Sequence, residues 1–166
     1  MTVRALRSTA QPIQALQVEA KDLEIEILTP VRQLTPELLD LLDVGPITAA
    51  QVLVSWSHPG RFRSEAAFAS FAGVPPIPAS SGLTDRHRIN RSGDRQLNRA
   101  LHTITLVRMR LDPATKTYVA RRAAEGKTSR DAQRCLERAI CRQLFEILER
   151  SDRSTGTKPK DLPQAA

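Results

Sequence analysis

Apolar residues recur every three or four positions along most of this chain of 166 residues, and that spacing restricts its fold more than any other feature. One run near the C-terminus places five apolar side chains on a single helical face: Ala132, Leu136, Ile140, Leu144 and Ile147. No segment has the clean alternation of a half-buried strand, although TDRHRI, residues 84–89, can form one edge of a short hairpin. The spacing predicts a mainly α-helical fold.

The segment LLDVGPITAAQVL is expected to join two short helices by a tight turn. Thr35 can cap the first helix, with Pro36 at its first position, and Gly45 and Pro46 stop it. The helical pattern resumes at Ile47. The result is a helix-hairpin-helix-like element at the start of a compact helical domain.

Further helices follow the same rules of capping and termination. Ser64 is placed to cap a third helix that ends at Gly73, and Ser129 to cap the last one. Between them we expect a long helix from Asp94 to about residue 111, closed by Pro113, and a shorter segment around Tyr118.

An N-terminal seam of apolar residues has spacings of 3, 4, 3 and 4: Ile13, Leu16, Ala20, Leu23 and Ile27. This seam is typical of the end of a coiled coil and equally of an amphipathic helix docked on its own domain. Thr29 and Pro30 are expected to end or interrupt this helix. The predicted organisation is a coiled-coil-like helix and linker at 1–34, a helical domain at 35–150 and a disordered tail at 151–166.

The chain is basic, with 25 Lys and Arg against 18 Asp and Glu and a formal charge of +7. Nucleic acid is therefore the first partner to consider. No stretch is long and apolar enough to span a bilayer, and the N-terminus lacks the apolar core of a secretory signal, so we expect a cytoplasmic, nucleoid-associated protein and no membrane partner. Three histidines and two cysteines, none at ligand spacing, predict neither a disulfide nor a metal site in this chain.

Arginine dominates the stretch from Thr84 to Arg110, where seven arginines face two aspartates. Such a run is usually a solvated face, but an excess of one sign at one-turn spacing can track a phosphate backbone. Five of these arginines are candidate contacts to nucleic acid: Arg86, Arg88, Arg91, Arg95 and Arg99.

Gly45 and Thr48, at the hairpin turn, are a second candidate contact. Backbone N–H groups at a glycine turn and a helix N-terminus can bind a phosphate without reading bases. The alternative is a packing turn between two core helices. The negative charge of Asp43, where such hairpins usually carry a glycine, opposes phosphate.

Ser80 and Ser81 precede Gly82 and the arginine run. A serine hydroxyl assisted by neighbouring His87 and arginines can attack a phosphodiester. Because Ser-Ser-Gly is common in ordinary loops, the spacing alone favours a loop.

Four ordered motifs resemble the C-terminal transposase domain of the bacterial insertion-sequence transposases related to the Piv invertase: LLDVGPITAAQVL, RFRSEAAFASFAGVPPIPASSG, RINRSGDRQLNRAL and YVARRAAEGK. In that family the domain follows a RuvC-like domain with a DEDD set of metal-binding carboxylates and a coiled coil, and a bridge RNA guides some members. The resemblance covers about residues 38–148.

By this resemblance, Gly73, Pro76 and Ser81 with Gly82 match the segment that carries the family's catalytic serine. Ser81 is thereby implied as the nucleophile of a phosphoserine linkage with DNA, and Ser80 is the alternative. Residues 13–28 are implied to pair protomers or to meet a RuvC-like partner chain. Guide RNA is a further partner that the resemblance raises.

The upstream half of the family pattern is absent, because Glu19, Asp22, Glu24 and Glu26 crowd one helical segment. We expect a divalent metal only with a RuvC-like partner, and no transposition by this chain alone. The sequence leaves two functions open. One is a DNA-binding transposase domain with a serine nucleophile. The other is a non-catalytic nucleic-acid-binding or dimerisation module, as a truncated remnant or half of a split enzyme.

Overall fold

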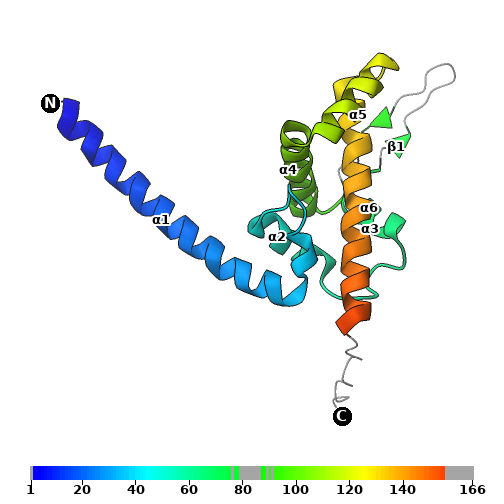
Figure 1. The fold of residues 1–166 in the computed structure, drawn as a ribbon, viewed down its shortest axis with the longest axis horizontal. Helices are drawn as coiled ribbons and strands as arrows, with labels where there is room; N and C mark the ends of the chain where they lie inside the picture. The colour runs from blue at the N-terminus through cyan, green and yellow to red at the C-terminus, as the bar shows by residue number, and fades with distance from the viewer. Residues whose placement is uncertain (1, 76, 79–86, 89, 91, 156–166) are drawn as a thin grey trace, which may run out of the picture.

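The structure is a computed structural model, and it describes residues 2–75, 77–78, 87–88, 90 and 92–155. A long N-terminal helix projects from a body of shorter helices that packs around the last helix of the described chain (Figure 1). The helices are α1 (Thr2–Leu34), α2 (Pro46–Trp56), α3 (Glu65–Phe71), α4 (Arg95–Leu111), α5 (Pro113–Ala124) and α6 (Ser129–Thr155). The mainly α-helical prediction is confirmed.

The core forms where α2, α3, α4 and α6 meet. Phe68 of α3, Leu101 and Ile104 of α4 and Leu144 of α6 are at most 1% exposed. The predicted inner face of α6 is buried as expected, with Ile147 only partly buried at the edge of the core. Removing these apolar surfaces from water is the main force that holds the body together.

Helix α1 departs from the prediction at its C-terminal end. The helix continues through Pro30 to Leu34, although proline removes one helical hydrogen bond and was expected to end it. Val31, one residue later, is 2% exposed and belongs to the core. Burial of the Val31 side chain offsets the missing bond.

The first helix of the predicted hairpin is wrong. Only Pro36–Leu38 is helical, as a single 3₁₀ turn (η1), and Thr35 makes no side-chain cap there. Leu38 is fully buried in the core. The segment between η1 and α2 is irregular and places its leucines on more than one side of the chain. The helical spacing of these leucines therefore predicts a helix that does not form. The helix-hairpin-helix-like element is therefore a turn followed by one helix.

Two predicted caps, at Ser64 and Gly73, are confirmed, and a third shifts by one residue. Ser64 accepts a hydrogen bond from the backbone N–H of Ala67, and Gly73 has a φ of +70°. The last helix is capped by Thr128, not Ser129. The Thr128 hydroxyl accepts from the backbone N–H of Asp131 at 3.2 Å, and the Asp131 carboxylate accepts from the Thr128 hydroxyl at 2.6 Å.

Two segments remain at the edges of the helical body. Ile77–Pro78 (β1) and His87–Arg88 (β2) pair antiparallel, Ile77 with Arg88 and Pro78 with His87, in agreement with the hairpin edge expected at 84–89. At the C-terminus, α6 runs to Thr155, so residues 151–155 are helical and do not belong to a disordered tail. Residues 156–166 lie outside the described residues.

Candidate nucleic-acid interface

The structure describes only part of the predicted site. Ser80, Ser81, Arg86 and Arg91 lie outside the described residues, and only the backbone of Arg88 is described, in β2. Four predicted contacts are described in full: Gly45, Thr48, Arg95 and Arg99.

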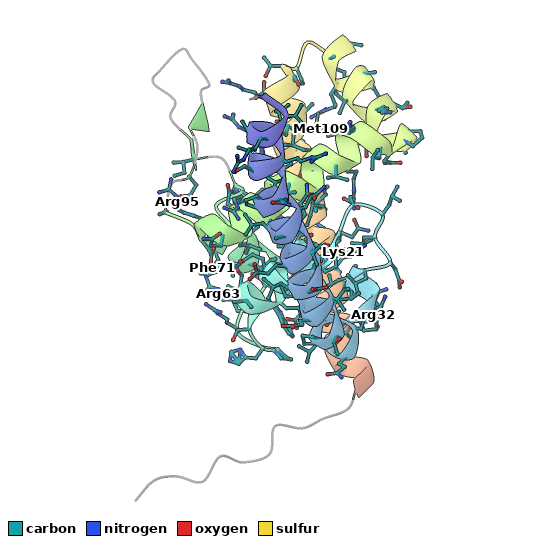
Figure 2. The ribbon with its side chains drawn as sticks, turned by 90° about the vertical axis from the view of Figure 1, so that its left-hand side faces the viewer. Lys21, Arg32, Arg63, Phe71, Arg95 and Met109 are labelled. Carbon is teal, nitrogen blue, oxygen red and sulfur yellow. The ribbon has the colours of Figure 1, made fainter. Side chains whose placement is uncertain are left out.

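Arg95 and Arg99 lie one turn apart at the start of α4, and both are exposed. The Asp94 carboxylate caps this helix by accepting hydrogen bonds from the backbone N–H groups of Gln96 and Leu97, both at 2.8 Å. Leu97 is fully buried, which fixes the rotation of the helix. Arg95 projects from this end of α4, on the side of the body where the β1–β2 hairpin lies (Figure 2). Within the described part of the chain, neither guanidinium has an ion-pair partner.

The start of α2 presents bare backbone groups. Gly45 is the N-cap residue, Pro46 follows it, and no side chain caps the helix. The Thr48 hydroxyl donates to the Gly45 carbonyl at 2.9 Å and does not cap the helix. The N–H groups of Ile47 and Thr48 belong to the first turn, and no side chain caps it, so they have no acceptor within the helix. A Cβ added to Gly45 would meet no atom within 4 Å, so glycine keeps this helix end uncovered.

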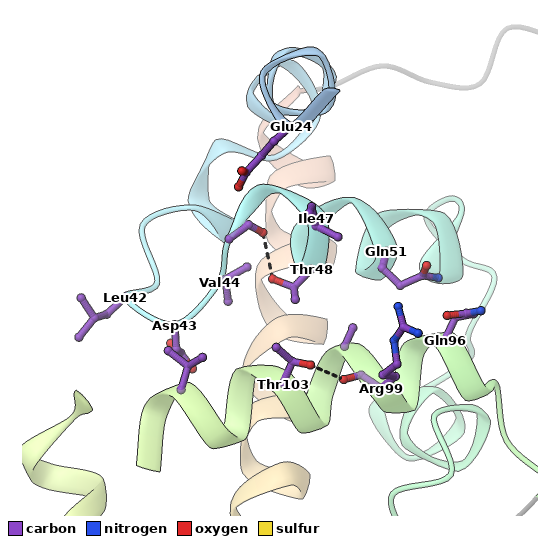
Figure 3. A pocket seen from close by; sticks show the side chains of 13 residues that line it. Glu24, Leu42, Asp43, Val44, Ile47, Thr48, Gln51, Gln96, Arg99 and Thr103 are labelled. Atoms are coloured by element: carbon purple, nitrogen blue, oxygen red, sulfur yellow. Dashed lines mark hydrogen bonds between the residues drawn. The ribbon is translucent and has the colours of Figure 1, made fainter. Parts of the chain in front are cut away.

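Gly45, Thr48 and Arg99 line one pocket of about 480 Å³ between α2 and α4 (Figure 3). Glu24 points into this pocket from α1, and Gln51 and Gln96 lie beside Arg99. The fold therefore brings together the two groups of contacts that the sequence predicted separately.

The charge of Asp43 is neutralised. Its carboxylate accepts hydrogen bonds from Arg108, from Nε at 2.6 Å and from Nη2 at 2.9 Å, and its side chain is 4% exposed. The repulsion of phosphate that the sequence suggested at this position is therefore opposed by a paired guanidinium. Arg108 is at the same time removed from the free arginines of α4.

A second pocket, of about 640 Å³, lies on the other side of Arg99 and holds residues that the sequence analysis did not single out. Arg95, Arg99 and His102 of α4 line it, with Asn90, Asn98, Ala72, Gly73 and Gly93. The Asn98 side chain donates to the Ala72 carbonyl at 2.9 Å, which ties α4 to the end of α3. The four-residue spacing of the arginines predicts Arg99 as a contact. It does not predict His102, Asn90 or Asn98, because contacts between segments bring these residues to the pocket.

The segment that contains Ser80 and Ser81 starts and ends at a contact between two glycines. A Cβ on Gly93 would lie 2.5 Å from the Gly73 nitrogen and 2.7 Å from its Cα. Beside this contact, the backbone N–H of Asp94 donates to the Phe71 carbonyl at 2.7 Å. Only glycine at position 93 permits this approach.

No three or more His, Cys, Asp or Glu side chains gather at a geometry suited to a metal ion within the described part of the chain. Among the described helices, none combines the length and apolar character needed to cross a bilayer.

Known proteins resemble most of the chain. Residues 37–120, just over half of the chain, match the family described as "Transposase IS116/IS110/IS902 family". The chain is similar to the "Insertion element IS110 uncharacterized 43.6 kDa protein" of Streptomyces coelicolor, with 37% identity over 144 residues, 85% of this chain and 36% of the relative. It is also similar to the "Insertion element IS900 uncharacterized 42 kDa protein" of Mycobacterium paratuberculosis, with 30% identity over 143 residues, 84% of this chain. The chain spans 36% of the length of each of these relatives. It belongs to the IS116/IS110/IS902 family of transposases.

Proposed function

We propose that residues 35–150 are a domain of an insertion-sequence transposase that binds double-stranded DNA through Arg95, Arg99 and the start of α2. One observation carries this proposal: Arg99 and the uncovered N-terminus of α2 line the same pocket, with no ion pair to Arg99 within the described residues. Free guanidinium groups and unsatisfied N–H groups both favour phosphate oxygens. The formal charge of +7 supports the same partner.

Replacing Arg95 and Arg99 by glutamate tests this proposal. We expect the double variant to abolish binding to a labelled duplex in fluorescence anisotropy. The wild type should lose affinity with salt, with a log–log slope of about −4.5 if five phosphates are neutralised. Arg142→Glu with Arg150→Glu is the matched control, because both residues are exposed on α6 and line none of the pockets described above. Equal losses in the two double variants would contradict a site on α4.

We further propose that Ser81, with Ser80 as the alternative, is the nucleophile of DNA recombination. Its Oγ would form a bond to phosphorus while the bond from phosphorus to the leaving sugar oxygen breaks. The serine proton ends on that oxygen, which leaves as a strand-end hydroxyl, and the product is a phosphoserine linkage. Family membership supports this role, and so does the glycine contact that brings both ends of the serine segment beside Arg95. With a RuvC-like domain supplied, nicked DNA should yield a serine adduct that Ser81→Ala removes. An adduct that persists with Ser80 intact would refute the assignment to Ser81.

A second function is favoured by the exposed apolar seam of α1, where Ile13, Leu16 and Leu23 are each more than half exposed. In this function the chain is a non-catalytic module that pairs with a second copy, or with a RuvC-like chain, through residues 13–28 and competes for DNA or guide RNA. The arginines then matter and the serine does not. Ser81→Ala would leave every phenotype unchanged, whereas Arg95→Glu with Arg99→Glu would remove them all.

A further inference from the structure

The row of pockets that Arg95 and Arg99 line continues onto α6. A third pocket, of about 390 Å³, shares Gly73, Asn90, Asn98 and His102 with the second one. From α6, Arg130, Gln133, Arg134 and Glu137 line it. The three pockets thus adjoin through Arg99 and then through His102, from the start of α2 to the start of α6.

His102 stands at the junction of the second and third pockets, held by α6. Its Nδ1 lies 3.0 Å from Oε1 of Glu137, and the Gln133 amide nitrogen lies 3.0 Å from the same carboxylate oxygen. The Gln133 amide nitrogen also lies 2.8 Å from Nδ1, so Gln133 and Glu137 together hold this edge of the ring. Nε2 has no hydrogen-bond partner within the described residues. The His102 side chain is 48% exposed, so Nε2 is open to a ligand.

We propose that His102, Arg130 and Arg134 form a second phosphate-binding site, which holds a phosphodiester of the nucleic acid that lies along α4. The inference rests on the proposed DNA-binding function and extends its contact surface onto α6. The ligand class follows from the donors: two guanidinium groups and an imidazole, in a pocket that adjoins the first arginine site.

The charges around His102 favour an anion. Arg95 and Arg99 precede it on α4, and Arg130 and Arg134 face the same pocket from α6. Glu137 is the one acid that lines the third pocket within the described residues. Arg130 is exposed, and Arg134 has one distant ionic neighbour, Asp131 at 3.7 Å, so both can turn to a phosphate.

The experiment measures anisotropy of a labelled 30-base-pair duplex with the full chain, at several salt concentrations. Arg130→Gln with Arg134→Gln should lower affinity and flatten the salt slope by about one to two units, at roughly 0.9 per lost phosphate contact. The matched control is Arg142→Gln with Arg150→Gln, which removes the same charge from the same helix; Arg142 lies about 12 Å along the helix axis from Arg134. His102→Ala should lower affinity roughly fivefold, because one hydrogen bond to phosphate is lost.

The outcomes separate this inference from the function beneath it. If the Arg130 and Arg134 variant behaves like its control, or if His102→Ala binds the duplex like the wild type, the second site is refuted while DNA binding through Arg95 and Arg99 stands. If no variant changes affinity, both proposals fail. An RNA of equal length that binds in place of the duplex would keep the phosphate site and overturn DNA as its source. Circular dichroism melting checks that each variant is folded.

Discussion

Helices α1 and α4 carry apolar residues at the same spacing, yet the two seams end in opposite environments. On α4, Leu97, Leu101 and Ile104 are at most 1% exposed, because α2 and α6 cover them. On α1, Leu16 is 63% exposed and Leu23 is 51% exposed. Figure 1 shows the reason: the N-terminal part of α1 leaves the body, and only its C-terminal end contacts α2 and η1. Spacing identifies the apolar side of a helix but not the surface that covers it.

The docked-helix interpretation of the N-terminal seam is therefore wrong for most of its length. Ile13, Leu16 and Leu23 are more than half exposed, and Ile27 alone among the large residues of the seam packs against the core. An exposed apolar stripe along several turns favours association with another helix. The interpretation of residues 13–28 as a coiled-coil segment stays a prediction.

The largest expected difference between the two seams is in folding stability. Leu101→Ala should lower the free energy of unfolding by about 3 kcal/mol, because it leaves a cavity in a packed core. Leu16→Ala, the same change on α1, should alter it by less than about 0.5 kcal/mol in the monomer. Urea unfolding followed by circular dichroism measures both. Similar losses in the two variants would mean that α1 is covered by its own chain.

The second expected difference is in association. Leu16→Glu with Leu23→Glu should weaken self-association by at least about a hundredfold, because each of the two chains loses two leucines that contribute about 1.5 kcal/mol or more apiece to the interface. The unfolding of the body should be unchanged. Sedimentation velocity over a range of concentrations measures this. A wild-type chain that stays monomeric throughout would contradict a self-pairing seam and leave a RuvC-like chain as the partner.

Backbone contacts of the body provide a third test. Gly93→Ala should cost about 2 kcal/mol, since its Cβ would overlap the backbone of Gly73 and force the segments apart. Gly45→Ala is the matched control, expected to cost less than about 1 kcal/mol, because its Cβ meets open space. Thermal unfolding of the two variants gives the comparison. If Gly45→Ala proves the more damaging change, the contact of Gly93 with Gly73 is not what holds the serine segment.

The smallest expected effect is on the reactivity of the two thiols, which reports whether the helical body stays closed. Burial raises the pKa of the Cys141 thiol to about 12, whereas Cys135, on the same helix, is exposed. The thiolate is the reactive form, so at pH 8 Cys141 stays protonated and unreactive. One thiol per chain should react with iodoacetamide in the native protein and two in denaturant, as counted by mass spectrometry. Two fast native reactions would show that the core around α6 opens.

The predictions held best where one local rule acted alone. Ser64 and Gly73 act through hydrogen bonds or backbone conformation within a few residues, and their roles followed directly from the sequence. Pro30 failed because burial of Val31 outweighs a local preference. The helix expected after Thr35 failed because its leucines pack from an irregular segment.

The candidate site divides in the same way. Arg95 and Arg99 could be predicted as neighbours because they share one helix and one turn. Their meeting with Gly45, and the pairing of Asp43 with Arg108, depend on how α2 packs on α4. His102 and Glu137 come from two helices, so no spacing along the chain can reveal their contact.

By itself, the sequence determined the helical class, the positions of most helix ends, the basic face of α4 and the resemblance to transposases. These depend on side-chain period, capping chemistry and charge, which act over a few residues. Only the tertiary structure decided which apolar seam is buried, which arginines stay free and which pockets adjoin. Those outcomes depend on contacts between distant segments, where burial and ion pairing outweigh local preference.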